Sequence, residues 1–236
     1  MEFHYNAFIS YRHAELDSKV AEDVQKQLER YHIPGAVQKE TGIRRINRIF
    51  RDKSELPLTS DLNEDILNAL RDADYLILIC SPRTKESLWV RKEVETFLET
   101  HGNERVLTVL AEGEPGDVIP SVLLQKTIET VAPDGQTASA VIQLEPLSCD
   151  YRIGFRRARQ TEIPRLAAAL IGCRYDELIR RQRQYQIRIR TAAAALMAAA
   201  AAWLFWSNIQ IRKNLNASLI SQSRYLAAES TNALNN

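Results

Sequence analysis

The chain has 236 residues, of which 45% are hydrophobic and 26% charged, and its formal net charge is +1. This near-neutral balance gives no bulk attraction to nucleic acid, so we expect no nucleic-acid partner. The three cysteines (Cys80, Cys149 and Cys173) and the four histidines are scattered without metal-ligand or redox spacing, so we expect reduced thiols and no metal site.

Strand and helix patterns alternate through the first part of the chain. HYNAFIS (4–10) and RINRIF (45–50) have the apolar, aromatic character of buried strands. Residues 17–31 carry apolar side chains at helical spacing, which predicts an amphipathic helix. The charged segment RDKSELPLTSDL (51–62) contains a proline and predicts an exposed loop, after which Asp61 and Glu64 start a further helix.

The same alternation continues to about residue 172. ADYLILICS (73–81) is a continuous apolar run of the kind that is buried on both faces in a parallel sheet. RVLTVLAEG (105–113) and ASAVIQLEP (138–146) predict a fourth and a fifth strand, and EIPRLAAALIG (162–172) predicts a last helix. Alternating strands and helices imply right-handed crossovers and a parallel sheet covered by helices on both faces.

The carboxyl ends of parallel strands meet at one edge of a sheet, where ligands of such folds bind. Three of these strand ends carry polar or charged residues, namely Ser10–Tyr11–Arg12, Phe50–Arg51–Asp52 and Ser81. The first strand is followed by SYRHAE, which contains no glycine. We therefore expect neither a Rossmann dinucleotide site nor a P-loop at this edge.

The helix expected after Ser81 and Pro82, which form an N-cap and first-turn pair, carries Trp89 and Glu93. This spacing is about one helical turn, so the two side chains lie within roughly 40° of each other. Both fall at the edge of the apolar stripe of the helix, whose members are Val90, Val94 and Phe97. A carboxylate there is partly desolvated and reachable, as a catalytic acid is; a solvated surface pair is the other interpretation.

Three blocks in order, NAFISYRH, IFRDKSELP and ADYLILICSPRTKESLWVRKEV, resemble the Toll/interleukin receptor (TIR) domain over about residues 4–171. The resemblance implies an α/β fold with a flavodoxin-like five-stranded parallel sheet. It also implies the activity of the enzymatic members, which cleave NAD+ at the nicotinamide–ribose bond, with NAD+ as the substrate and no cofactor. Other members of the family only assemble.

The resemblance also assigns roles to individual residues. Glu93 is implied as the catalytic glutamate, because WVRKE matches the Trp, three residues, Glu pattern of the enzymatic members. Implied substrate-binding residues are Tyr11, Arg12, Phe50, Asp52, Ser54 and Trp89. Residues 51–62 correspond to the "BB" loop through which such domains self-associate, with Arg51, Lys53, Glu55, Leu56, Pro57 and Leu58 at the interface. The chain departs from the family at three points. Val90 stands where many members have Cys, and Ser87 lies two residues before the Trp, where many members have a Ser three residues before it. The BB loop contains no glycine.

Cleavage of the nicotinamide–ribose bond is compatible with a site that has one catalytic carboxylate. The nicotinamide of NAD+ leaves as a neutral molecule, and positive charge develops on the ribose. Glu93 can stabilise this charge electrostatically, bind the ribose hydroxyls or attack C1 covalently. The sequence leaves these three roles open.

The composition changes near residue 174. Residues 174–190 contain six arginines, residues 191–207 are uncharged and Ala-rich with Trp203 and Trp206 at one end, and residues 208–236 are polar. The uncharged run spans roughly 25 Å as a helix. We expect a single-pass transmembrane helix in a lipid bilayer, with the TIR domain of residues 1–173 on the cytoplasmic, arginine-rich side. A soluble Ala-rich helix packed against a partner is the other interpretation.

The polar tail has a helical stripe and resembles the segment that precedes repeat arrays in large bacterial signalling proteins, so we expect the chain to be the front end of a longer protein. The leading hypothesis is a bacterial, membrane-tethered NAD+ hydrolase that is activated by self-association and serves as a defence or stress effector. A non-catalytic TIR scaffold that recruits other TIR domains is the alternative. A related enzyme that processes another nucleotide in the same cleft is the third.

Overall fold

The computed structural model describes residues 5–51, 62–131, 137–143 and 147–234. The chain divides into two compact units, Met1–Gln182 and Arg183–Asn236. The first unit contains the sheet and the candidate site.

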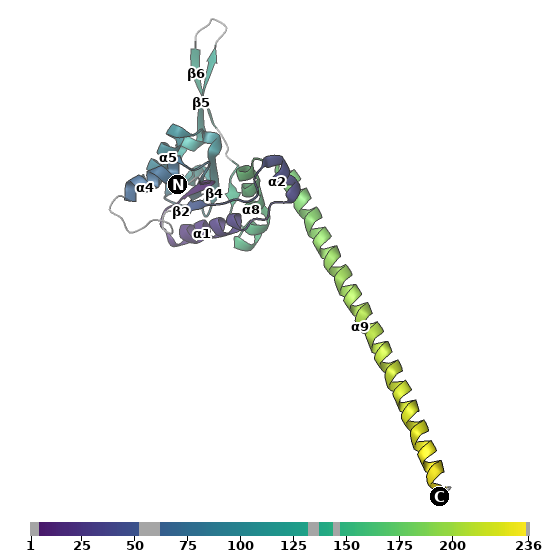
Figure 1. Cartoon of the computed structure of the whole chain (residues 1–236). Helices are drawn as coiled ribbons and strands as arrows, with labels where there is room; N and C mark the ends of the chain where they lie inside the picture. Colours follow the sequence, from purple (N-terminus) through teal and green to yellow (C-terminus); the bar gives the residue numbers. More distant parts are fainter. Residues whose placement is uncertain (1–4, 52–61, 132–136, 144–146, 235–236) are drawn as a thin grey trace. The chain divides into compact units, whose positions relative to one another are not determined.

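The first unit is built on a five-stranded parallel sheet (Figure 1). The strand order is β2-β1-β3-β4-β7, and each neighbouring pair runs in parallel. This confirms the flavodoxin-like sheet that the sequence predicts. The strands are β1 (Ala7–Ser10), β2 (Ile49–Arg51), β3 (Leu76–Cys80), β4 (Val106–Leu110) and β7 (Cys149–Asp150).

Strand β3 shows why the sheet is covered on both faces. All five of its residues are buried, and alternate residues face opposite ways. Ile77 and Ile79 belong to one hydrophobic cluster, which they share with α1 (Glu15–Glu29) and α8 (Phe155–Ile171). Leu76, Leu78 and Cys80 belong to a second cluster, shared with α4 (Leu62–Arg71) and α5 (Leu88–Thr100). The continuous apolar run therefore serves two separate cores.

Shorter elements complete the unit. They are the helices α2 (Gly35–Thr41), α6 (Pro115–Val118) and α7 (Ser121–Leu124), the 3₁₀ turns η1 (Thr84–Glu86) and η2 (Asn103–Arg105), and the strands β5 (Gln125–Val131) and β6 (Thr137–Gln143). The second strand is shorter than the predicted 45–50, because only Ile49–Arg51 pair with β1.

The strand predicted at 138–146 is present as β6, but it is not the fifth strand of the main sheet. The residues of this segment that form a strand pair antiparallel with β5 in a separate two-stranded hairpin, in register from Gln125↔Gln143 to Val131↔Thr137. The place of the fifth strand is taken by β7, which is only two residues long. A two-residue strand has no period to detect, whereas the longer β6 has the composition of a strand without belonging to the main sheet.

The predicted start of α5 at Ser81 and Pro82 is also wrong. The chain makes the η1 turn first, with Arg83 in the left-handed region at φ 71°, and α5 begins at Leu88. Ser87 is the N-cap, and its hydroxyl accepts a hydrogen bond from the backbone N–H of Val90 at 3.4 Å. Ser81 instead turns its hydroxyl into the protein interior, toward Asp17. Of the predicted Asp61–Glu64 pair, Asp61 lies outside the described residues.

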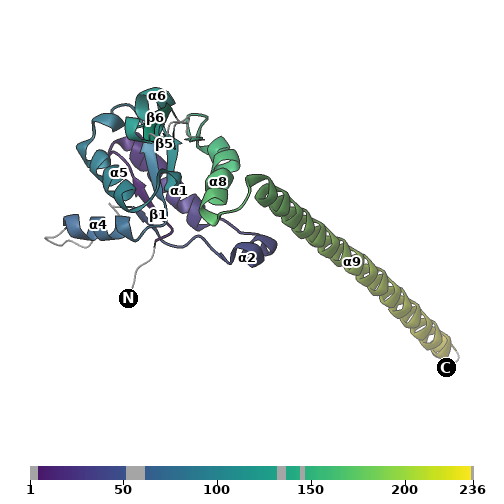
Figure 2. The same ribbon diagram turned by 90° about the horizontal axis from the view of Figure 1, so that it is seen from above.

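The last helix, α9 (Tyr175–Leu234), begins in the first unit and forms the described part of the second. Leu178 is fully buried in the core, and the hydroxyl of Tyr31 donates a hydrogen bond to Gln182 Oε1 at 2.8 Å. Among the described residues, one helix, Tyr175–Arg224, is long and apolar enough to cross a membrane, and none of its most apolar window is buried. Figure 2 shows α9 as one continuous helix.

Candidate active site

Glu93 is a buried acid on a helix that otherwise follows the predicted pattern. Val90, Val94 and Phe97 are buried on α5, as the apolar stripe predicts. Glu93 is only 5% exposed and lies on the same side of the helix. Its Oε2 accepts a hydrogen bond of 2.5 Å from the hydroxyl of Ser10, the last residue of β1. The carboxylate is therefore turned toward the carboxyl end of the central sheet and away from bulk water.

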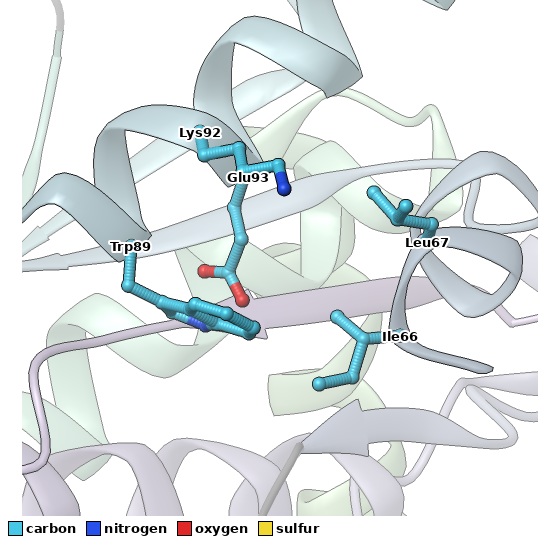
Figure 3. A pocket seen from close by; sticks show the side chains of 5 residues that line it. All are labelled: Ile66, Leu67, Trp89, Lys92 and Glu93. Atoms are coloured by element: carbon cyan, nitrogen blue, oxygen red, sulfur yellow. The ribbon is translucent and has the colours of Figure 1, made fainter. Parts of the chain in front are cut away.

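Beside this carboxylate lies a narrow hollow between α4 and α5, which we name the Glu93 hollow. Its lining residues are Ile66, Leu67, Trp89, Lys92 and Glu93. Figure 3 shows the carboxylate next to the indole of Trp89, with Ile66 and Leu67 on the facing side. Trp89 is 39% exposed, so one part of the ring is accessible from outside. The hollow thus has three apolar lining residues, together with the Glu93 carboxylate and the Lys92 side chain.

A second, wider hollow adjoins the first at Trp89, and we name it the Arg12 hollow. Its lining residues are Tyr11, Arg12, His13, Ala14, Ser87 and Trp89, and its volume including the open mouth is about 720 Å³. The rings of Tyr11 and His13 lie with their centroids 4.9 Å apart. Trp89 borders both hollows, so its side chain lies between the Glu93 hollow and the Arg12 hollow.

Asp17 forms a second buried carboxylate site next to the Arg12 hollow. It is 1% exposed, and its Oδ2 accepts a hydrogen bond of 2.7 Å from the Ser81 hydroxyl. The guanidinium Nε of Arg12 lies 3.5 Å from the same oxygen. Burial raises the pKa of Asp17 above its ordinary value, while Ser81 and Arg12 act in the opposite direction. Asp17 therefore contacts both Arg12, which follows β1, and Ser81, which follows β3.

Sequence reasoning gave no role to Ser10 or Asp17. Ser10 was placed at the strand-end rim, but its contact with Glu93 joins residues 83 positions apart and has no local signature. Asp17 lies three residues before Val20 on the buried stripe of α1, and this polar residue on an apolar face is the signal that could have singled it out.

The predicted substrate-binding residues divide into three groups. Tyr11, Arg12, Trp89 and Glu93 come together around the two hollows. Phe50 is 3% exposed and lies in the core, stacked on Phe8 at a centroid distance of 5.1 Å. Phe50 is not among the described residues that line either hollow. Asp52 and Ser54 lie outside the described residues.

Most of the predicted loop interface cannot be placed. Arg51 ends β2, and its Nε donates a hydrogen bond of 2.9 Å to Gln25 Oε1 on α1. The other predicted interface residues lie outside the described part of the chain, namely Lys53, Glu55, Leu56, Pro57 and Leu58.

The cysteines and the acidic residues form no metal cluster in the described ranges, where no three His, Cys, Asp or Glu side chains are placed to hold an ion. All three cysteines are free thiols, with Cys80 and Cys149 buried and Cys173 half-buried. Burial raises the pKa of Cys149 to about 12, so this thiol stays protonated at neutral pH.

Comparison with known proteins identifies similar chains. The family model for the TIR domain matches residues 7–140. The protein "NAD(+) hydrolase ApTIR" of Actinoplanes sp. is 30% identical over 217 residues, which covers 83% of this chain but 27% of that protein, so the chain spans about a quarter of its relative's length. The structure of a metazoan TIR-STING receptor from C. gigas shares 22% identity and covers 45% of this chain and 31% of that chain, with a TM-score of 0.32.

Proposed function

The chain belongs to the TIR domain family, and we propose that it is an NAD+ hydrolase that cleaves the bond between nicotinamide and ribose. The name of the Actinoplanes relative supports this choice of substrate. The observation that carries the proposal is the placement of Glu93: a buried carboxylate, oriented by a serine hydroxyl, beside an accessible indole in the Glu93 hollow.

The Glu93 hollow suits the departure of nicotinamide. The pyridinium ring of NAD+ is flat and cationic, and the apolar side chains of Ile66, Leu67 and Trp89 offer walls for such a ring. When the glycosidic bond breaks, the ring leaves neutral and positive charge develops on the ribose. A carboxylate in surroundings that exclude water stabilises that charge more strongly than it would in bulk solvent. This position of Glu93 is compatible with each of its three possible roles, namely electrostatic stabilisation, binding of the ribose hydroxyls and covalent attack on C1.

The rest of the dinucleotide is assigned to the Arg12 hollow. The guanidinium of Arg12 matches phosphate oxygens, and Tyr11 supplies an aromatic wall. Trp89 then lies at the junction between the ribose and the phosphates. Asp52 and Ser54 complete the proposed substrate contacts, whereas Phe50 lies in the core and is not among them. The reaction needs no cofactor, since the leaving group is already activated by its own charge.

Substitution of Glu93 tests the function. Glu93→Gln keeps the size of the side chain and removes its charge, so the release of nicotinamide from NAD+ should fall about 100- to 1000-fold. Glu95→Gln is the matched control, because Glu95 lies exposed on the same helix and outside both hollows, and it should leave the rate unchanged. The measurement is NAD+ consumption by the purified chain, alone and clustered on vesicles.

Two results would contradict the proposal. One is a Glu93→Gln variant that consumes NAD+ at the wild-type rate. The other is a wild-type chain that consumes no NAD+ in any clustered state, which would leave the non-catalytic scaffold, or consumes a different nucleotide, which would point to the third hypothesis.

We further infer that the chain is a membrane-bound effector. In this proposal, residues 1–173 form the TIR domain, 174–190 the basic juxtamembrane segment, 191–207 the single transmembrane span and 208–236 the polar tail. The arginine excess before the span supports a cytoplasmic TIR domain. Confinement to two dimensions raises the effective concentration of the domains, which favours self-association through the 51–62 loop and so activates the enzyme. Such an enzyme depletes NAD+ on demand, as a bacterial defence or signalling effector requires.

A further inference from the structure

The contact between Ser10 and Glu93 links the central sheet to the candidate catalytic acid. Ser10 is 1% exposed and Glu93 is 5% exposed, so water has little access to either group. Their separation of 2.5 Å is at the short end of the range for a hydroxyl that donates to a carboxylate. The Ser10 hydroxyl is the donor of this bond and Glu93 Oε2 is the acceptor.

The hydroxyl belongs to a strand that has neighbours on both sides. Ser10 ends β1, which pairs with β2 on one side and β3 on the other, and it lies opposite Leu78 in the β3 register. Glu93 reaches this point through three rotatable bonds from α5, so without an anchor its carboxylate has several accessible positions. The bond to Ser10 selects the one seen in Figure 3, beside the Trp89 indole.

We propose that Ser10 is a positioning residue for the reaction, one that holds the Glu93 carboxylate oriented beside Trp89 through the hydrogen bond to Oε2. This inference rests on the proposed function. The serine hydroxyl replaces a hydrogen bond that the carboxylate gives up when it leaves water. Ser10 itself does not touch the reacting atoms.

The pair of Ser81 and Asp17 shows that a buried serine–carboxylate hydrogen bond does not by itself make the serine a positioning residue for the reaction. Ser81, at the end of β3, also donates to a buried carboxylate, that of Asp17. Asp17 is not among the residues that line either hollow, whereas Glu93 is part of a hollow wall. The two serines thus form the same kind of bond at adjacent strand ends, and only that of Ser10 is directed at a candidate catalytic group.

The test begins with Ser10→Ala in the full chain. Loss of a hydrogen bond to a charged, buried oxygen should lower kcat for NAD+ cleavage about 10- to 100-fold. The KM for NAD+ should change much less, because Ser10 does not contact the substrate. Ser10→Thr retains the hydroxyl and should recover most of the lost kcat. Thr108→Val is the matched control: Thr108 is buried on β4, and the substitution removes a hydroxyl–hydroxyl bond of 2.5 Å to Ser148 that lies outside the hollows.

A double-variant comparison separates positioning from a general loss of stability. If Ser10 acts through Glu93, Ser10→Ala should cause no further loss of rate when Glu93 is already Gln. The inference is overturned if Ser10→Ala keeps the wild-type kcat, if Thr108→Val lowers kcat equally, or if Ser10→Ala lowers the residual rate of Glu93→Gln by its full factor. The proposed function fails separately, if Glu93→Gln alone retains the wild-type rate. Melting temperatures of all variants show whether a variant is folded.

Discussion

At the scale of single residues, the candidate site combines two acids that experience different environments. Glu93 lies at a hollow and is bound by one serine, while Asp17 is enclosed among Ser81, Arg12 and the core. The pKa of Asp17 is raised chiefly because burial disfavours its charged form. An acid whose pKa is higher in the folded than in the unfolded state binds its proton more tightly when folded. Its contribution to stability is therefore greatest at low pH.

The raised pKa of Asp17 predicts how the stability of an Asp17→Asn variant changes with pH. As the pH rises from the unfolded pKa of about 4 through the raised folded pKa, the wild type loses stability that the uncharged variant does not lose. The free energy of unfolding of the variant, relative to the wild type, should therefore increase between about pH 4 and pH 7. Urea unfolding at several pH values measures it. A difference that stays constant or shrinks across this range would contradict the assignment.

At the scale of secondary-structure elements, prediction succeeds where the apolar pattern is long. A continuous apolar run predicts the five-residue β3, and apolar residues at helical spacing predict the stripe of α5. Prediction fails for β7, which is too short to have a pattern, and for the start of α5, where a 3₁₀ turn follows Ser81. Around the site, Trp89 and Glu93 could be paired from their spacing alone. The bond from Ser10 to Glu93 could not, because it depends on how β1 and α5 meet in three dimensions.

The backbone conformation at the N-terminus of helix α8 gives a prediction about stability. Gly154, its N-cap, has φ 92° and ψ 147°, a conformation that residues with a side chain rarely adopt. Gly154→Ala should therefore destabilise the protein by about 1–3 kcal/mol. Gly116→Ala is the control, since Gly116 lies inside α6 without a positive φ and an added methyl group meets nothing within 4 Å. Equal midpoints of urea unfolding for the two variants would contradict this explanation.

At the scale of the whole molecule, the described chain joins a globular α/β unit to a long helix of different composition. The side chains of α9 from Arg183 to Arg224 are mostly exposed, including apolar ones such as Leu196, Trp203 and Phe205. Exposed apolar surface of this extent is typical of a segment that meets lipid or a partner. Composition could predict this helix, but composition cannot distinguish lipid from protein as its surroundings.

Extraction experiments make that distinction. The full chain should remain with membranes after treatment with alkaline carbonate. Replacing Leu196 and Ala200 by Arg should release it, because each charge at the centre of a span costs about 2.5–3.5 kcal/mol. The same pair of substitutions at Gln210 and Asn214, beyond the uncharged run, should not. Retention of the Leu196/Ala200 variant would indicate that the helix is bound by protein and not by lipid.

The division of β3 between two hydrophobic clusters has an evolutionary consequence. Odd-numbered residues of the strand serve the α1/α8 side and even-numbered ones the α4/α5 side, so the sheet insulates one layer from the other. The α4/α5 layer holds both walls of the Glu93 hollow, and a lineage could reshape that hollow while the opposite layer kept the fold intact. Amino-acid substitutions in the two layers should then accumulate at different rates. A shift of β3 by one residue would exchange its two faces, so neither layer should tolerate it.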